Sequence, residues 1–230
     1  MTTFQRARSE EQRAVRSRAI LDTAAAMLSE MPVAQASLNE LSRRVGLAKS
    51  NVLRYFESRE AVLLELLDAA CREWLAELGD ALPAAVGPAA VGPGAELARR
   101  CDQVAAAVAA SLAGRPVLCD LMSAQAAVLE HNVSAQVAAR YKRAAIVNIA
   151  ALAGLVLGRV PELGADDAER FAGATFMVTG AVWTYAHPAA AMLAAYESHP
   201  ELASMRLEFT PTLRQVLEVL LAGLLARQSR

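Results

Sequence analysis

The feature that most restricts the fold of this chain is a pair of short helical stretches placed close together near its amino-terminal end. The first begins at a capping box, in which Ser37 accepts a hydrogen bond from the backbone N–H of Glu40 while the Glu40 side chain reaches back. It ends at Gly46, because a left-handed conformation costs least at glycine. A turn of Gly-Leu-Ala then leads into the second stretch, Lys49 to Phe56. Two short helices joined by about three residues that include a glycine are typical of a helix-turn-helix.

The residues on either side of this motif also favour helices. Between Arg13 and Ser29 apolar or small residues recur at the spacing of one buried helix face, and Met31-Pro32 ends the pattern. Ser58 is expected to cap a long, strongly apolar helix over residues 59–78. Apolar residues make up 55% of the chain and aromatic ones only 5%, and the abundant Ala and Leu lose little on entering a helix. We therefore predict an all-α fold.

A change of composition separates these helices from a larger second part. Residues 79–94 are rich in glycine and proline and predict a loop, because proline removes helix donors and glycine raises the cost of ordering. Further helices are expected beyond it, with starts marked by Ser134, by Asp166 with Glu169 as an acidic capping box, and by Thr210 before a proline. Their expected ranges are 95–113, 117–131, 135–158, 166–187 and 211–227, with one or two short helices within 188–209.

Charge is distributed unevenly along the chain. The 23 basic and 24 acidic residues nearly cancel, but residues 1–59 hold ten Arg or Lys against six acidic residues, and the rest hold 13 against 18. An amino-terminal part of net charge +4 joined to a body of −5 indicates a basic binding end. The high apolar content excludes a disordered chain. The charged start lacks the apolar stretch of a signal peptide, so a cytoplasmic protein is expected.

Membrane insertion and catalysis are both disfavoured. Phe171 to Tyr196 contains no charged residue, but His187-Pro188 interrupts the run before the roughly 20 residues that a membrane span needs. A helix buried on all sides fits better, and no membrane partner is expected. The chain contains none of the common hydrolase, phosphate-binding, dinucleotide-binding or zinc-protease motifs. We expect no enzyme, no catalytic residue, no cofactor and no metal site.

The cysteines have two interpretations. Cys71, Cys101 and Cys119 are far apart and do not have the spacing of metal ligands. Buried thiols in a reducing compartment are the simpler interpretation, and a thiol that senses redox state is the alternative.

The second short stretch has the composition of a DNA-reading element. Val52 and Phe56, four residues apart, share one side and are expected to pack on the domain. A recognition helix packs one side in this way and presents polar and basic side chains to bases and phosphates on the other. An ordinary solvated helix is the alternative, but the tight turn and the basic balance of the segment disfavour it. The side chains expected to face outward are Lys49, Ser50, Asn51, Leu53, Arg54 and Tyr55.

The same residues resemble a known family. The pattern SxxELxxxVGLAxxxVLRYFxSREAVL, which continues into a long helix, is similar to the tetracycline-repressor (TetR) family of transcriptional regulators over about Arg13 to Leu67. The resemblance implies an N-terminal three-helix helix-turn-helix DNA-binding domain and a larger, divergent helical C-terminal domain. It also implies a phosphate contact at Arg59, where the following helix N-terminus supports an anion. The further residues that it places at or beside DNA are Leu38, Asn39, Arg43 and Arg44.

Two residues depart from the family pattern. Ala48 stands where a Ser or Thr usually caps the recognition helix, which costs that helix about 1 kcal/mol. Leu53 replaces a common Tyr and offers an apolar contact, such as one to a thymine methyl group, in place of a hydroxyl. The operator sequence therefore does not follow from the resemblance.

The expected organisation includes a homodimer, which the resemblance implies and the apolar surface independently favours. The helices near 166–187 and 211–227 are broadly apolar, and two from each subunit would form an isologous four-helix bundle. The alternative is that both are buried in the core of a monomer. The domains expected are a DNA-binding domain at 11–58 with its helix-turn-helix at about 37–56, a connecting helix at 59–78, a loop at 79–94, and an effector-binding and dimerisation domain at 95–230.

The function expected is that of a ligand-responsive transcriptional regulator, most simply a repressor. As a homodimer it would bind a palindromic double-stranded DNA operator and be released by a small hydrophobic or amphipathic effector. A regulator without a ligand and a thiol-based redox regulator are the alternatives. Asn148 is the most informative pocket candidate, because a buried amide needs partners, and His187 is interpreted as a helix-end residue. The candidate effector-binding residues are the rarer large or polar ones: Trp74, Met122, Gln125, His131, Asn132, Tyr141, Asn148, Phe176, Met177, Trp183, Tyr185 and His187.

Overall fold

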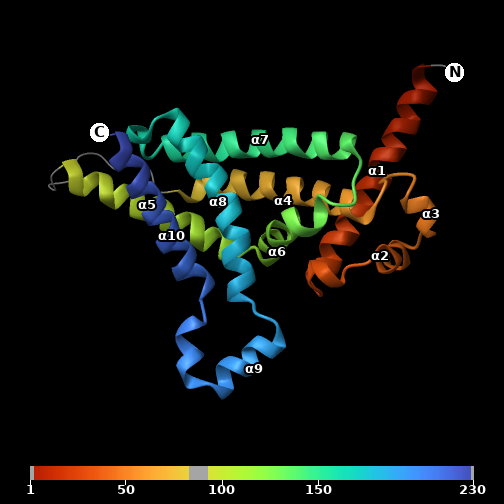
Figure 1. Cartoon of the computed structure of the whole chain (residues 1–230). Coiled ribbons are helices and arrows are strands. Elements are labelled where there is room, and N and C mark those ends of the chain that lie inside the picture. The colour runs from red at the N-terminus through yellow and green to blue at the C-terminus, as the bar shows by residue number, and fades with distance from the viewer. Residues whose placement is uncertain (1–2, 83–92, 229–230) are drawn as a thin grey trace.

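The computed structural model describes residues 3–82 and 93–228. Within these ranges the chain forms helices joined by short loops and contains no strand, which confirms the predicted all-α fold (Figure 1). The elements are α1 (Thr3–Leu28), η1 (Val33–Gln35), α2 (Leu38–Val45), α3 (Lys49–Val52), α4 (Arg59–Ala81), α5 (Pro93–Ala113), α6 (Pro116–Ala124), η2 (Gln125–Leu129), α7 (Ala135–Leu157), η3 (Pro161–Leu163), α8 (Ala165–Ala186), α9 (Ala190–Ser198), η4 (Pro200–Met205) and α10 (Phe209–Gln228).

The amino-terminal helices α1, α2 and α3 form a small domain at one end of the molecule (Figure 1). The fully buried Ile20 and Ala24 of α1 belong to the same core as Leu41 of α2 and Val52 of α3. The apolar pattern between Arg13 and Ser29 therefore marks the buried part of α1. The helix itself begins ten residues earlier, at Thr3, where no apolar pattern signals it.

The predicted caps of this domain are largely confirmed. The hydroxyl of Ser37 accepts from the backbone N–H of Glu40 at 3.1 Å, and the hydroxyl of Ser58 accepts from that of Ala61 at 3.1 Å. Gly46 ends α2 in the left-handed region with φ 72°. The second half of the capping box is wrong, because the Glu40 carboxylate bonds to arginines on its own helix and does not reach back.

Helix α4 connects the small domain to the body. It packs against α1 at one end and against α5, α6 and α7 along its length (Figure 1). It continues to Ala81, beyond the predicted end at residue 78, so the first residues of the predicted 79–94 loop are helical. The rest of that loop, residues 83–92, lies outside the described residues, and α5 begins at Pro93.

The body is built around α8, which packs against α6, α7 and α10. A Cβ at Gly180 of α8 would lie 2.8 Å from the carbonyl oxygen of Met122 on α6, so only glycine permits this approach. The helix predicted at 117–131 is divided. After Ala124 it continues as a π-helical stretch, η2, in which Glu130 N–H bonds to Gln125 O at 3.1 Å.

Helix starts in the body are partly as predicted. Ser134 caps α7, since its hydroxyl accepts from Val137 N–H at 3.2 Å. The capping box at Asp166 and Glu169 is wrong, because α8 begins after Gly164, whose φ is 71°, and has no side-chain cap. The cap at Thr210 is also wrong, since α10 already begins at Phe209.

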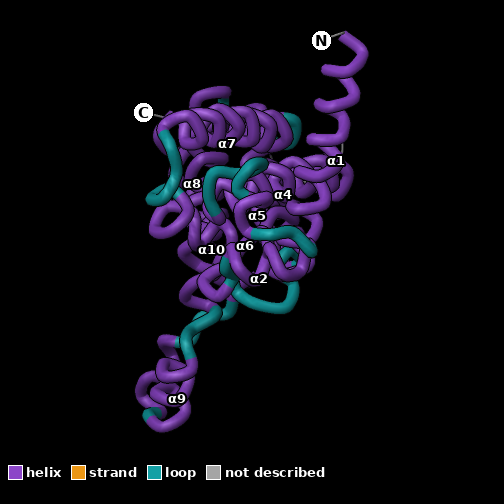
Figure 2. The backbone as a smooth tube through the Cα atoms, turned by 90° about the vertical axis from the view of Figure 1, so that its right-hand side faces the viewer, coloured by secondary structure: helices purple, strands orange, loops and turns teal. Residues whose placement is uncertain are grey.

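Residues 188–209 form an arm that projects from the body (Figures 1 and 2). It contains α9 and η4, which pack on each other, and neither has a buried residue. The prediction of one or two short helices here is confirmed. By length and composition α10 is apolar enough to cross a membrane, but one face of it packs against α5 and α8, with Leu213, Leu217 and Leu221 fully buried.

Candidate nucleic-acid interface

The second helix of the motif is shorter than expected. Helix α3 covers Lys49–Val52, and the chain then tightens into a turn in place of the helix predicted to reach Phe56. In this turn Arg54 N–H bonds to Asn51 O at 3.3 Å, three residues back. No side chain caps the helix at Ala48, which agrees with the missing Ser or Thr. The missing cap leaves the first-turn N–H groups without a side-chain acceptor, which disfavours a helix this short.

The motif presents one buried side and one open side. Val52 is fully buried and Phe56 is 5% exposed, as predicted. Leu53, with 39% of its surface exposed, lies on the open side. Lys49, Ser50, Asn51 and Arg54 are also exposed there, so the polar side chains predicted to read DNA are accessible together.

Tyr55 differs from its prediction. It is half-buried against the domain core and does not face fully outward. The Arg13 guanidinium of α1 lies 6.0 Å from its ring centroid, which is within the range of a cation–π contact. Tyr55 thus links α1 to the turn that follows α3.

Two arginines of α1 belong to this surface and were missed by the sequence reasoning. Arg13 donates to the backbone oxygen of Arg54 at 3.3 Å. Arg16 lines a hollow of about 280 Å³ together with Leu47, Asn51, Arg54 and Tyr55. The signal available in the sequence was their spacing of three residues, which places both on one face of α1.

The two arginines of α2, Arg43 and Arg44, both pair with Glu40 on the same helix. Glu40 bonds to Arg43 Nε at 2.9 Å and to Arg44 Nε at 2.7 Å, and these hydrogen bonds lower the pKa of Glu40 to about 2. Arg44 also pairs with Glu30 at 2.8 Å, whereas the Arg43 side chain remains 71% exposed. Arg43 is therefore the more accessible cation. Of the other α2 candidates, Asn39 is exposed and Leu38 is half-buried.

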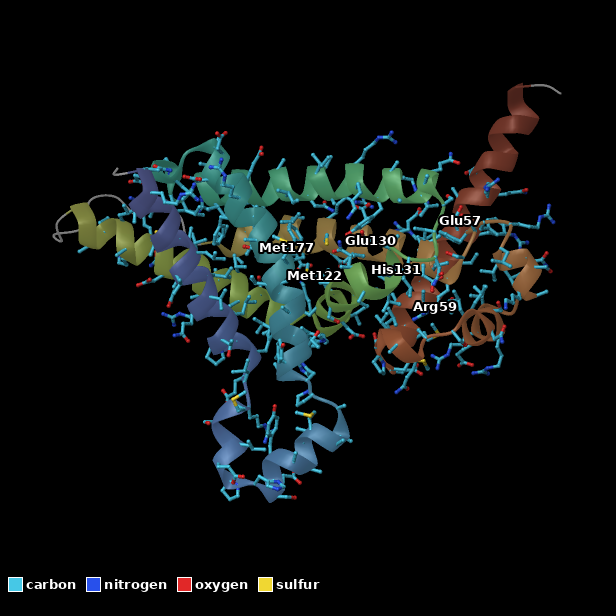
Figure 3. All side chains as sticks on the ribbon, viewed as in Figure 1. Glu57, Arg59, Met122, Glu130, His131 and Met177 are labelled. Atoms are coloured by element: carbon cyan, nitrogen blue, oxygen red, sulfur yellow. The ribbon has the colours of Figure 1, made fainter. Side chains whose placement is uncertain are left out.

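Arg59 does not project toward a ligand. It lies at the junction between the small domain and the body (Figure 3). Its Nη2 donates to the backbone oxygen of Val33 and its Nη1 lies 3.4 Å from Glu60, with only 21% of the side chain exposed. The guanidinium is engaged inside the fold and is not presented for the predicted phosphate contact.

The candidate effector residues do not form one group. Trp74 and Phe176 meet edge to face at 5.9 Å, and Met122 is buried on α6. Trp183 stacks on His187 at 3.8 Å at the end of α8. His187 is the C-terminal cap of α8, as interpreted from the sequence. The remaining exposed or half-exposed candidates are His131 and Asn132 in the loop before α7, Gln125 in η2, and Met177 and Tyr185 on α8.

Tyr141 and Asn148 of α7 face a groove along α4. Two adjoining clefts of about 130 and 310 Å³ lie there and share Arg72. The amide of Asn148 donates to Asp68 Oδ1 at 3.0 Å, which satisfies the buried amide. Burial raises the pKa of Tyr141, so its hydroxyl stays protonated at neutral pH. The walls combine leucines with these polar groups.

The three cysteine thiols lie in environments that disfavour reaction. Cys71, Cys101 and Cys119 are buried and free. Burial raises the pKa of Cys71 and of Cys119 to about 12, and that of Cys101 is raised as well. A thiol must ionise to react, so these environments disfavour redox sensing. Within residues 3–82 and 93–228, no three His, Cys, Asp or Glu side chains come together as a metal site.

A short α2, a left-handed glycine and a solvent-facing α3 define a helix-turn-helix DNA-binding protein. Comparison with known families agrees. Residues 20–66 match "Bacterial regulatory proteins, tetR family", and residues 68–228 match "Tetracyclin repressor-like, C-terminal domain". The chain belongs to the TetR family of DNA-binding transcriptional regulators, which are generally not enzymes and among which repression and homodimerisation are typical.

Solved structures share this fold. A TetR transcriptional regulator from Rhodococcus sp. RHA1 is 14% identical with a TM-score of 0.54, covering 94% of this chain and 97% of that one. The fatty acid degradation regulator FadR from Bacillus halodurans is 14% identical with a TM-score of 0.50, covering 90% and 98%. No curated protein matches. At these identities the likeness extends to the fold alone.

Proposed function

We propose that this protein is a ligand-responsive repressor that binds a palindromic operator as a homodimer and is released by a small amphipathic molecule. The observation that carries the proposal is the course of α4. It starts directly after the turn that follows α3 and continues into the body, where one face of it is buried against α5, α6 and α7. A change of the body that moves α4 therefore moves the DNA-reading surface with it.

The DNA-reading part of the proposal rests on exposed α3 and its neighbours. Asn51 and Arg54 have side chains that can form hydrogen bonds with base edges in the major groove. Lys49 and Arg43, both exposed, supply positive charge for the phosphates. Arg16 adds a cation from α1 beside the same hollow.

We place the effector in the groove between α4 and α7. Its larger cleft, about 310 Å³, is of the size that small ligands occupy. Leu75, Val147 and Leu155 offer apolar walls, while Arg72 and Asn148 offer polar partners. A molecule with an apolar body and a polar or anionic end suits this set. Binding between α4 and α7 would act directly on the helix that carries the reading domain.

The homodimer is proposed through α8 and α10, which lie on the same side of the body (Figures 1 and 2). Met177 is 72% exposed and Tyr185 69% on α8, and Val219 is 66% exposed on α10. Large apolar side chains exposed along adjacent helices mark an interaction surface. An isologous contact of these helices gives a four-helix bundle.

The test of DNA reading is selection of bound sequences from a random duplex pool by the purified protein. A palindrome is expected, with half-sites about one helical turn apart. Asn51→Ala should change the selected sequence, because it removes a base contact. Arg99→Ala, which removes a charge from α5 in the body, is the matched control and should select the same sequence. Recovery of no enriched sequence would overturn the proposal.

The effector groove is tested by screening amphipathic acids for release of the selected operator. Arg72→Ala should weaken the response to an active compound at least about tenfold without changing operator affinity, because Arg72 belongs to both clefts. Arg99→Ala on α5 is the control. An active compound whose potency is unaffected by Arg72→Ala would place its site elsewhere.

A further inference from the structure

The arm formed by α9 and η4 is incomplete in a single chain. Met192 is 49% exposed and Met205 64%, and neither helix contains a buried residue. Isolated helices of fewer than about 12 residues are marginal in water even with good sequences. The half-buried Leu193, Tyr196 and Leu202 do not amount to a core. The arm therefore needs an apolar surface outside its own chain.

The connections of the arm indicate which surface this is. It leaves the end of α8 and returns at the start of α10, so it continues the two helices of the proposed dimer face. In the side view the arm leans toward the side on which α8 and α10 lie (Figure 2). A partner placed against α8 and α10 would thus lie within its reach.

The symmetry of a DNA-bound dimer indicates where on the partner the arm lands. The small DNA-binding domains of both protomers must face one duplex. The two-fold axis therefore runs along the α8–α10 face toward the small domain. The arm and α7 lie at opposite edges of that face (Figure 1). A half-turn about this axis exchanges the edges and brings α7 of the second copy next to the arm.

The surface of α7 suits the arm in chemistry as well as in position. Ile146 is 66% exposed and Val147 62%, which is unusual for residues of this size on a body helix. The exposed Arg143 adds positive charge one turn away, whereas Glu197 and Glu201 of the arm are exposed and negative. Apolar contact flanked by opposite charges is typical of a specific interface.

We propose that the α9–η4 arm of each protomer clamps onto α7 of a second copy of this chain, with Met192 packing against Ile146. The inference rests on the proposed homodimer and extends it, since the clamp lies outside the α8–α10 bundle. It also connects the arm of one subunit to the helix that forms the proposed effector groove of the other. Dimer stability and effector response are then coupled through α7.

Cross-linking tests the clamp, with Met192→Cys and Ile146→Cys combined in one full-length chain. The native cysteines are buried, so a short bismaleimide should react at the new thiols alone. We expect a covalent dimer on denaturing gels from the double variant and none from either single variant. Met192→Cys with Asp102→Cys, on an exposed position of α5, measures the background.

Analytical ultracentrifugation of the unmodified protein distinguishes failure of the arm contact from failure of the α8–α10 dimer. If the protein is a dimer in solution but the double variant does not cross-link, the clamp is wrong and the α8–α10 dimer is still supported. A monomer at micromolar concentration overturns both. As a second measurement, Met192→Asp should raise the dimer dissociation constant at least about tenfold, and an unchanged constant would contradict the clamp.

Discussion

The carboxylate of Asp120 accepts a hydrogen bond from the backbone N–H of Val33 at 2.6 Å, across the boundary between the body and the DNA-binding domain. Val33 is 1% exposed and starts η1, where Pro32 provides no side-chain cap. Its carbonyl oxygen is bonded to Arg59 of α4. Both backbone groups of one residue are thus held by parts of the chain that lie on different sides of the boundary.

Asp120→Ala should destabilise the protein, because it leaves the N–H of buried Val33 without a partner. The expected loss is about 1–3 kcal/mol in the free energy of unfolding, measured by urea denaturation. Asp120→Asn, which keeps a carbonyl acceptor, should lose clearly less. Equal losses in the two variants would show that the hydrogen bond is not the reason.

Gly180→Ala should disturb the contact of α6 with α8. The added Cβ would meet Met122 O at 2.8 Å, and a backbone carbonyl inside a packed helix pair cannot move away cheaply. The free energy of unfolding is expected to fall by about 1–3 kcal/mol, despite the better helix propensity of alanine. Gly154→Ala is the control, since nothing lies within 4 Å of a Cβ there. It should be neutral or stabilising, and a comparable loss in both variants would refute the steric explanation.

Glu57→Gln should produce a difference in thermal stability that depends on pH. The Glu57 carboxylate accepts from Ser134 N–H at 2.6 Å, and this bond holds the pKa of Glu57 below its ordinary value of 4.5. A lowered pKa in the folded state adds stability above pH 4.5 that is lost as the pH falls through the lowered value. The variant should melt below the parent protein at pH 7, with the gap closing on acidification. Glu73→Gln, at an exposed position of α4, is the control, and a gap constant with pH would contradict the assignment.

The native cysteines should resist alkylation. With the pKa of Cys71 and Cys119 raised to about 12 by burial, almost no thiolate is present at pH 8. Mass spectrometry after brief treatment with N-ethylmaleimide should find the folded protein unmodified, and the urea-unfolded protein should carry three adducts. Rapid labelling in the folded state would restore a redox role to consideration.

Removal of the negative charge of Glu40 on α2 should strengthen nonspecific DNA binding. Glu40→Gln frees Arg43 from its neutralising carboxylate, whereas Arg44 stays paired with Glu30. Affinity for random duplex should rise, and its dependence on salt should steepen by up to about one unit, because more counterions are displaced. Glu73→Gln again controls for the loss of a negative charge. Fluorescence anisotropy at several salt concentrations measures both effects.

Local signals were sufficient where one short segment decides the conformation. Ser37, Gly46, Ser58 and Ser134 end or begin helices as predicted, because each cap involves residues only three or four positions apart. The buried pair Val52 and Phe56 follows from helical spacing in the same way.

Where distant segments meet, the sequence was insufficient. Arg59 was expected to face DNA, but it turns inward because the carbonyl of Val33, 26 positions away, accepts from it. Glu40 had two possible partners, and the arginines on its own helix were preferred to the backbone N–H behind it. Tyr55 is half-buried because α1 crosses the turn and places Arg13 beside its ring.

The sequence by itself therefore determined the all-α fold, the helix-turn-helix and most of the residues on its open side, since each depends on local spacing and on the caps of single helices. Only the tertiary structure decided which arginines are free to meet a ligand, why Gly180 must be glycine, and how the arm leaves its apolar residues uncovered. Those properties depend on contacts between residues far apart in the chain. Such contacts exist only after the helices have packed.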